Sequence, residues 1–284
     1  MWHNLRQLTR YRGLIQSLVA RELKARYRGS VLGFFWSFVN PLLLLIIYSV
    51  VFTYFLENRT EGLQPYALFL FCGLLPWTWF STSLNESAGV LISGGNLIKK
   101  VLFPAEVLPI VSVLANMVHF LFGLPILAGF LAYYMFIYSP PPVDPASAEP
   151  AVQQISLHLA ELIWFPVVVF VQLVLTLGLS LLVSALAVHY RDIRDILSNL
   201  LTFWFFATPI IYWWNTPEME GFKWFFDLNP FTHLAVSYQE ILFFPDNAFG
   251  HWKWLLALAA MSMVVFLVGY WVFDRLRDSF AEVV

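Results

Sequence analysis

Long apolar runs separated by short polar segments fill most of this chain. Six runs approach or exceed the roughly 20 residues that an α-helix needs to cross a membrane. The pattern predicts an all-α integral membrane protein with six transmembrane helices. An even number of spans places both chain ends on one side. The expected spans cover residues 33–56, 65–88, 106–136, 162–188, 197–214 and 254–273.

The fifth run is the shortest, and its aromatic residues and Pro209 also suit an interfacial or broken segment. Between the fifth and sixth runs, residues 215–253 contain two semi-apolar stretches, 222–228 and 231–244. Each is too short to cross a membrane and too apolar for an ordinary loop. We expect re-entrant or interfacial helices on the outer face, where irregular backbone is tolerated if protein or a water-filled cavity covers it. The proline-rich connection at 139–161 reads as an external loop, and we assign it no role.

Charge placement gives an independent test of this topology. Only 12% of residues are charged, about half of the roughly 25% that is usual in soluble domains. Basic residues gather on the cytoplasmic side of membrane proteins, and 13 of the 16 lysines and arginines fall on one predicted side, so both termini are predicted to be cytoplasmic. The 13 are Arg6, Arg10, Arg12, Arg21, Lys24, Arg26, Arg28, Lys99, Lys100, Arg191, Arg194, Arg275 and Arg277.

Residues 1–32 form a separate N-terminal part before the transmembrane domain at 33–284. Within it, residues 4–28 are expected to form an amphipathic helix, because most of its cations fall in one arc of a helical wheel and its leucines lie opposite. Arg12 and Arg26 lie outside that arc. Such a helix lies in the membrane interface, with its basic face toward headgroup phosphates or a protein partner. A plain topology anchor is the other interpretation.

Asn40-Pro41 lies inside the first apolar run. Asparagine as N-cap with proline at the first helical position is a helix-start signal. The run is therefore expected to contain a short piece at 30–39 and a spanning helix from Pro41, with a simple kink at Pro41 as the alternative.

The chain contains no evident catalytic or metal-binding motif. The segment from Gly94 to Lys100 lacks the second glycine before lysine and the Ser/Thr of a phosphate-binding loop. The six histidines show no paired spacing that would hold a metal. We therefore predict no catalytic residue, no metal and no bound cofactor in this chain.

Two predicted cytoplasmic loops carry a pattern. In the first, which contains Asn96, Lys99 and Lys100, Pro104 and Glu106 suit the first turn of the third span. The second is expected to form a short solvated helix with an Arg191–Asp195 pair. The loops are either ordinary interfacial turns or docking surfaces for a soluble partner. The second loop contains Tyr190, Arg191, Asp192, Arg194 and Asp195.

The whole chain resembles the membrane subunits of ABC-2 type polysaccharide exporters, the permeases of O-antigen, capsule and teichoic acid. Four stretches carry the resemblance: residues 21–33 leading to Trp36 and Asn40-Pro41, residues 96–109, residues 190–193, and Asn229-Pro230.

The resemblance implies the ABC-2 (type V) exporter fold in a bacterial inner membrane. It also implies a second copy of the chain, two copies of a separate ATPase that uses ATP and Mg²⁺, and a lipid-linked glycan as substrate, beside membrane lipids. No nucleic acid partner is expected. The two loops and the N-terminal helix, a gate helix with Arg21, Lys24, Arg26 and Arg28, would contact the ATPase. The lipid-linked polymer would pass between the two subunits.

A glycan path needs aromatic rings that hold sugar faces weakly and let them slide. Aromatic residues make up 18% of the chain, and many of them are expected to form membrane-interface belts. The resemblance places the path beside the first and fifth spans. The aromatic candidates are Tyr48, Phe52, Tyr54, Phe203, Trp204 and Tyr212.

Glu86 and His119 are the ionisable groups expected nearest membrane depth, where a charge costs roughly 2.5–3.5 kcal/mol. Glu86 is expected at the cytoplasmic interface in preference to the path. His119 is expected to be a hydrogen-bonded interior histidine in preference to a proton relay.

Two other functions stay open. One is an ABC-2 exporter of drugs or lipids with a narrower path. The other is a membrane-embedded transferase acting on lipid-linked sugars, for which Asp192 with His189, or Asp227 with His233, would have to supply the acid–base chemistry.

Overall fold

The computed structural model describes residues 11–51, 65–99, 103–137, 161–214, 216–244 and 249–283, and every regular element in these ranges is helical. Short 3-10 turns precede α3, α7 and α9, at Gly33–Phe35, Glu161–Trp164 and Pro217–Phe222. The α-helices are α2 (Arg12–Arg26), α3 (Trp36–Val50), α4 (Tyr66–Ser93), α5 (Gly95–Ile98), α6 (Val107–Phe136), α7 (Phe165–His189), α8 (Ile193–Phe206), α9 (Lys223–Leu228), α10 (Pro230–Leu242) and α11 (Trp252–Val283).

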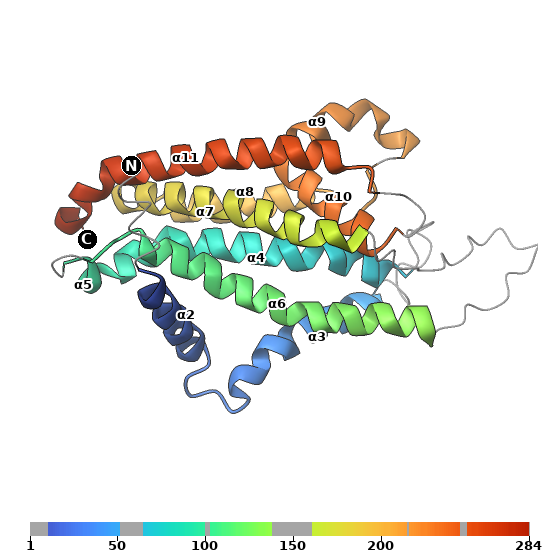
Figure 1. Ribbon diagram of the computed structural model, residues 1–284, viewed down its shortest axis with the longest axis horizontal. Coiled ribbons are helices and arrows are strands. Elements are labelled where there is room, and N and C mark those ends of the chain that lie inside the picture. The colour runs from blue at the N-terminus through green and yellow to red at the C-terminus, as the bar shows by residue number, and fades with distance from the viewer. Residues whose placement is uncertain are drawn as a thin grey trace, which may run out of the picture.

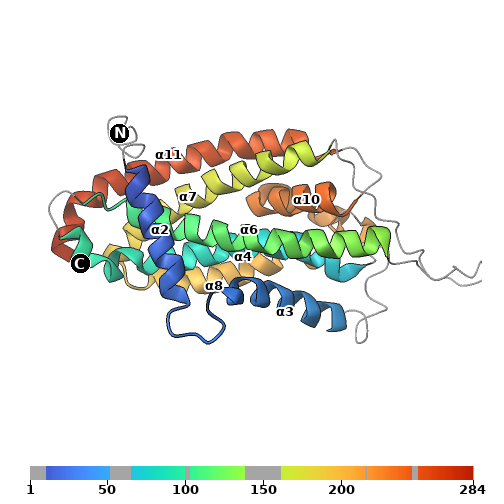
Figure 2. The same cartoon turned by 60° about the horizontal axis from the view of Figure 1, so that its bottom comes forward.

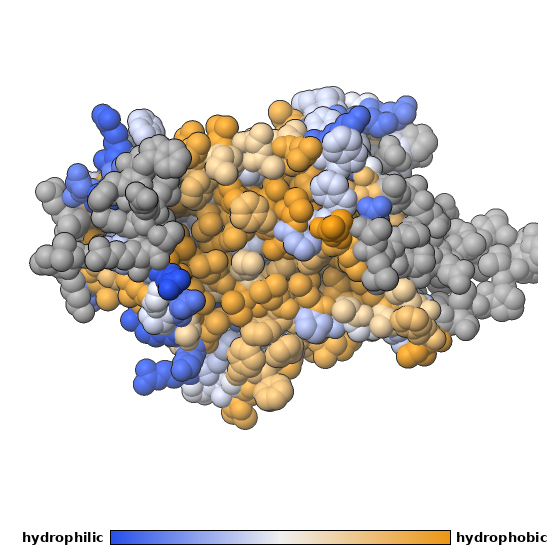
Figure 3. All heavy atoms as spheres, in the orientation of Figure 1, coloured by the Kyte–Doolittle hydropathy of each residue, from blue (hydrophilic) through white to orange (hydrophobic). Residues whose placement is uncertain are grey.

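Five described segments are long and apolar enough to cross a membrane. They are Gly33–Val50, Tyr66–Ser93, Val107–Phe136, Glu161–His189 and Trp252–Phe280. They run along the long axis of the bundle (Figure 1), and apolar residues cover the middle of its visible surface while hydrophilic ones collect near its ends (Figure 3). The chain is therefore a multi-pass membrane protein.

The fifth predicted span does not form one helix over 197–214. Helix α8 begins at Ile193 and ends at Phe206, and its 14 residues extend only about 21 Å. Pro209 explains the end, because proline lacks an amide hydrogen and disfavours helical backbone at the residue before it. The segment takes the broken form that its composition allowed, and the count of six spans stays a prediction.

Helix α3 starts earlier than Asn40-Pro41 predicted. It begins at Trp36, directly after the Gly33–Phe35 turn, and contains Pro41 in its interior. Asn40 is therefore not an N-cap, and the expected separation of 30–39 from a helix at Pro41 is wrong. Pro41 is the sixth residue of the helix, so its missing amide leaves the Ser37 carbonyl without the usual intrahelical hydrogen bond. Residues 52–56 of the expected span lie outside the described residues.

Helix α4 forms the centre of the bundle. Most of its side chains are buried, and it packs against α3, α6, α7, α8 and α10. Near its middle, Trp77 and Phe80 each place their rings 4.8 Å from that of Phe231 on α10. Helices α9 and α10 occupy most of the two semi-apolar stretches at 222–228 and 231–244, and α10 is buried along nearly its whole length.

Helix α2 lies across the bundle at the end where α4, α7 and α11 finish (Figure 2). The turn that follows it contains Gly29 and Gly33 with φ angles of 81° and 50°, a left-handed backbone that glycine adopts without a steric penalty. This turn sends α3 back along the bundle. The end of α11 and the α4–α6 connection, with α5, lie at the same end (Figure 1).

Candidate functional site

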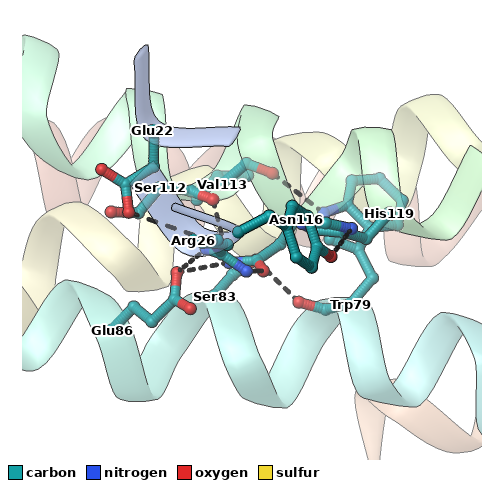
Figure 4. A network of polar contacts seen from close by, with 10 residues as sticks. Glu22, Arg26, Trp79, Ser83, Glu86, Ser112, Val113, Asn116 and His119 are labelled. Atoms are coloured by element: carbon teal, nitrogen blue, oxygen red, sulfur yellow. Dashed lines mark hydrogen bonds and ion pairs between the residues drawn. The ribbon is translucent and has the colours of Figure 1, made fainter. Parts of the chain in front are cut away.

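Arg26 anchors helix α2 to the bundle. Its guanidinium donates to Glu86 Oε2 on α4 at 2.6 Å and to Asn116 Oδ1 on α6 at 2.9 Å. The Asn116 amide in turn donates to the same Glu86 oxygen at 2.7 Å and to the Ser112 carbonyl at 3.0 Å. We call Arg26, Glu86 and Asn116 the Arg26 network (Figure 4). Each of its three side chains contacts the other two.

The network continues toward α3 through a second set of contacts. Ser37 Oγ donates to the Tyr27 hydroxyl at 2.9 Å, and this hydroxyl lies 3.4 Å from His119 Nδ1 on α6. His119 is therefore a hydrogen-bonded interior residue, as its sequence context predicted. A pocket of about 220 Å³ between α3, α4 and α6 adjoins these groups.

A small apolar cluster also holds α2 against α6. Leu18 is the one buried residue of α2 within the described chain, and it packs against Val107 and Val111 on α6. Leu14, Ile15 and Val19 are partly buried against the same cluster. Helix α2 is thus docked on protein through this cluster and through Arg26. Arg21, Lys24 and Arg28 lie on or beside the same helix, and all three are exposed to some degree.

Helix α2 also borders a charged cleft of about 480 Å³. Arg21, Glu22 and Arg26 line it from α2, Glu86 and Gly89 from α4, and Arg194 from α8. We call it the α2–α8 cleft. A Cβ added at Gly89 would overlap the Arg194 guanidinium, so Arg194 lies directly against the α4 backbone where glycine leaves room. Sequence reasoning had not connected Arg194 with α4.

The first connecting loop is tied to the last helix. Glu106, which precedes α6, is 4% exposed, and its carboxylate lies 3.9 Å from Arg277 Nη1 on α11. Its side chain makes no capping hydrogen bond to α6. Asn96 lies in the short helix α5 and Lys99 follows it, whereas Lys100 lies outside the described residues.

The second loop is exposed at the same end of the bundle. Tyr190 is 65% exposed, and Arg191, Asp192 and Asp195 are also exposed. The expected Arg191–Asp195 pair does not form, because α8 begins only at Ile193 and Arg191 lies in the turn before it. Both loops thus lie on the end that carries α2. Their contact with an ATPase stays a prediction.

The aromatic path candidates do not share one environment. Phe203 on α8 is 66% exposed. Trp204 points inward, packs against Trp77 and Phe80, and donates from Nε1 to Asn229 Oδ1 at 2.7 Å. Tyr48 is partly buried against the core, and the Tyr212 hydroxyl donates to the Phe206 carbonyl at 3.1 Å. Phe52 and Tyr54 lie outside the described residues.

A histidine pair connects α10 with the start of α11 at the other end. His233 Nδ1 lies 3.0 Å from His251 Nε2, and the His251 amide donates to Glu240 Oε2 at 3.1 Å. Burial lowers the pKa of His233, and burial together with the neighbouring His233 lowers that of His251 to about 4. Burial also raises the pKa of Glu240, against the hydrogen bonds that its carboxylate accepts.

Neither candidate pair for a transferase forms an acid–histidine contact. His233 Nε2 lies 2.9 Å from the backbone carbonyl of Asp227, not from its carboxylate. His189 instead contacts the Ala185 carbonyl and Ser279. Among the described residues, no group of three or more His, Cys, Asp or Glu side chains is placed to hold a metal.

Long apolar helices in one bundle, with a short helix docked across the end that carries many of the cations, are features of a polytopic membrane protein. Comparison with known proteins also indicates a membrane protein. Residues 13–243 match the ABC-2 type transporter family. The chain belongs to this family and is a transport protein, as its sequence predicted.

Three relatives illustrate the similarity. The O-antigen export system permease protein RfbA of Myxococcus xanthus is 39% identical over 279 residues, covering 98% of both chains. A protein of the same name from Klebsiella pneumoniae is 30% identical over 272 residues, covering 95% of this chain and 94% of the relative. The polysialic acid transport protein KpsM of Escherichia coli is 31% identical over 77 residues, covering 27% of this chain and 30% of that protein.

Proposed function

We propose that this chain is the membrane-spanning permease subunit of an ATP-driven exporter that moves a lipid-linked polysaccharide across the bacterial inner membrane. The observation that carries the proposal is the similarity to an O-antigen export permease along nearly the full length of both chains. Because the shorter match to a polysialic acid transport protein points to the same class of cargo, a polysaccharide is a better candidate than a drug or a simple lipid.

The energy source is a separate ATPase. Helix α2, the α4–α6 connection and the loop before α8 lie at one end of the bundle, and this end carries most of the cations. The positive-inside rule assigns that end to the cytoplasm, where an ATPase operates. Two ATPase subunits with ATP and Mg²⁺ would dock on Asn96, Lys99, Lys100 and residues 190–195.

A second copy of the chain completes the transporter. Helix α3 exposes an apolar surface that includes Leu43, Ile46 and Ile47. Helix α8 exposes Ile196, Leu200 and Phe203. In the proposed homodimer these two helices border the glycan path. Phe203 is then the described aromatic candidate best placed to contact the polymer.

The test reverses two charges in the loop before α8. The variant Arg191→Glu/Asp192→Arg is expressed with the ATPase, and polysaccharide at the cell surface is measured. Export is expected to be lost while insertion and assembly of the permease persist, because both side chains are exposed and neither supports the bundle.

The matched control reverses an exposed ion pair at the opposite end. Lys223 and Glu220 lie 3.5 Å apart beside α9, and the Lys223→Glu/Glu220→Lys variant is expected to export normally. Full export by the first variant would refute the docking role of residues 190–195. Surface polysaccharide that persists after deletion of the whole permease would refute the proposed function itself.

A further inference from the structure

Three arginines and two glutamates line the α2–α8 cleft, and two of the arginines, Arg26 and Arg194, lie against α4 beside Glu86. Glu86 is paired with Arg26 at 2.6 Å. Arg194 lies against Gly89, which is three residues after Glu86 on α4, and residues three apart on a helix lie on the same face. The guanidinium of Arg194 is thus held about one helical turn from the carboxylate that holds α2.

Removal of Arg26 from Glu86 without a replacement would be costly. The Glu86 side chain is 34% exposed and belongs to a spanning helix, and an unpaired charge in such a place is strongly unfavourable. If a second arginine takes the first one's position, the carboxylate keeps a partner, and Asn116 can continue to donate to it. Exchange of partners therefore offers a low-energy route to undock α2.

The rest of the α2 attachment is compatible with such a step. Among the described residues of α2 only Leu18 is fully buried, and Leu14, Ile15 and Val19 pack on the same cluster while partly exposed. The turn after α2 contains Gly29 and Gly33, and a Cβ at either position would meet no atom within 4 Å. This turn has room to change its backbone conformation.

We propose that Glu86 is a shared acceptor that couples α8 to α2: Arg26 occupies it while α2 is docked, and Arg194 occupies it when the loop before α8 is displaced. The inference rests on the proposed function, because the displacement is supplied by an ATPase bound at residues 190–195. Arg194 and Glu86 are then positioning residues. Gly89 leaves the space in which the Arg194 guanidinium lies, one turn along α4 from Glu86.

The experiment reads the position of α2 directly. In the full complex with the ATPase, Cys72 is replaced by serine, and Leu18→Cys on α2 is paired with Val111→Cys on α6. A short bis-thiol reagent then reports docking with and without Mg-ATP, and size-exclusion profiles confirm assembly. The parent complex is expected to cross-link without nucleotide and to lose most of this signal with Mg-ATP.

Two single variants separate docking from release. In Glu86→Gln the docked form is expected to fall about tenfold or more relative to the undocked form, as when one member of a part-buried charge pair is removed. In Gly89→Ala the new methyl group displaces Arg194, so α2 is expected to stay cross-linked with Mg-ATP. Gly129→Ala, where a Cβ meets no atom within 4 Å, is the control and is expected to behave as the parent.

Charge swaps provide the decisive comparison. Arg26→Glu/Glu86→Arg restores a docked pair but leaves Arg194 facing a like charge, so docking is expected to return while Mg-ATP-dependent release stays lost. Adding Arg194→Glu is expected to restore release. Normal docking in Glu86→Gln, or normal release in either the double swap or Gly89→Ala, would overturn the inference.

The cross-link does not depend on the cargo. If the swaps behave as expected but the parent complex exports no polysaccharide, the proposed function fails and the exchange stands. If polysaccharide is exported normally by the double swap, the exchange fails and the proposed function stands.

Discussion

Asn229 uses both ends of its carboxamide at the junction between α8 and α10. Its Oδ1 accepts from Trp204 Nε1 at 2.7 Å and from the Phe231 amide at 3.0 Å. Its Nδ2 donates to the Ala207 carbonyl at 3.1 Å and to Thr208 Oγ1 at 3.0 Å. The side chain both caps α10 and satisfies the backbone where α8 ends.

We expect Asn229→Asp to destabilise the protein more than Trp204→Phe does. The aspartate keeps the acceptor but places a second oxygen against the Ala207 carbonyl, which is expected to cost about 3 kcal/mol. Trp204→Phe removes one hydrogen bond and some packing, for about 1–2 kcal/mol. Thermal midpoints of the detergent-solubilised protein measure the order. Phe203→Ala on the exposed neighbour is the control, and equal midpoints for Asn229→Asp and this control would contradict the assignment.

Acidic pH is expected to weaken the junction that His233 and His251 form. An unfolded His251 takes up a proton near pH 6.5, whereas the folded one stays neutral until about pH 4. The unfolded state then binds more protons, so this group's contribution is complete above pH 6.5 and is lost progressively toward pH 4, by up to about 1.4 kcal/mol per pH unit. Glu240 has the opposite effect on stability. Because its pKa is raised in the folded state, the folded protein binds a proton at a higher pH than the unfolded chain does, which favours folding as the pH falls.

The measurement compares thermal midpoints at pH 7.5 and pH 5. His251→Gln is expected to lower the midpoint at pH 7.5 and to show a smaller fall at pH 5 than the unmodified protein. Glu240→Gln removes the opposing proton uptake and is expected to show a larger fall. Identical pH dependence in all three proteins would rule out the histidine pair as its source.

Arg26 illustrates which site residues the sequence identified and which it missed. Its position outside the basic arc of the helical wheel was visible in the sequence, and the structure shows this side chain turned into the bundle, onto Glu86 and Asn116. The departure of Arg26 from the basic arc therefore indicated that its side chain faces the protein. Its partners lie 60 and 90 residues away in the chain, and a periodicity argument carries no information about such distant pairs.

Helices α7 and α11 pack closely because two glycines face each other. A Cβ at Gly269 would overlap the Gly178 carbonyl oxygen, and one at Gly178 would lie 2.6 Å from the Phe266 Cα. The neighbouring atoms belong to the backbone and cannot rotate away. The approach of these two helices therefore depends on glycine at both positions.

Gly269→Ala is expected to destabilise the bundle by about 1–3 kcal/mol, the usual cost of overpacking a core. Gly129→Ala on α6 adds the same methyl group where no atom lies within 4 Å, and better helix propensity makes it neutral or slightly stabilising. Thermal midpoints of the two variants test this contrast. A Gly269→Ala protein as stable as Gly129→Ala would show that α7 and α11 do not approach through these glycines.

Hydropathy located most long helices well but did not define their ends. The expected spans at 65–88 and 254–273 become Tyr66–Ser93 and Trp252–Val283. Helix α11 continues past Asp274, Arg275 and Arg277. A helix can extend beyond the membrane into water, so the end of an apolar run does not mark the end of the helix. Asn-Pro misled at Asn40 and fitted at Asn229, whose side chain caps α10. The two sites differ in the backbone before the dipeptide. The residues before Asn40 are already helical, whereas Asn229 has extended backbone and its side chain can cap the helix that follows.

The distribution of charge over the complete chain leads to a prediction about orientation. Lys99 follows α5 and Arg191 precedes α8, and both lie at the end of the bundle where α2 docks. Lys223 and Lys253 belong to the opposite end, beside α9 and at the start of α11. Because basic residues are retained on the cytoplasmic side during insertion, the first group should face the cytoplasm and the second the outside.

Single cysteines introduced into a Cys72→Ser background test this orientation with a thiol reagent that does not cross membranes. Cysteines at Lys223 and Lys253 are expected to react in intact spheroplasts, whereas those at Lys99 and Arg191 should react only after lysis. All four positions are exposed at least in part, so a lack of reaction reports sidedness and not burial. Reaction of the Lys99 and Arg191 positions in intact spheroplasts would place the two loops and the docked helix α2 outside the cell, away from any source of ATP, and would remove the basis for both the ATPase docking and the partner exchange at Glu86.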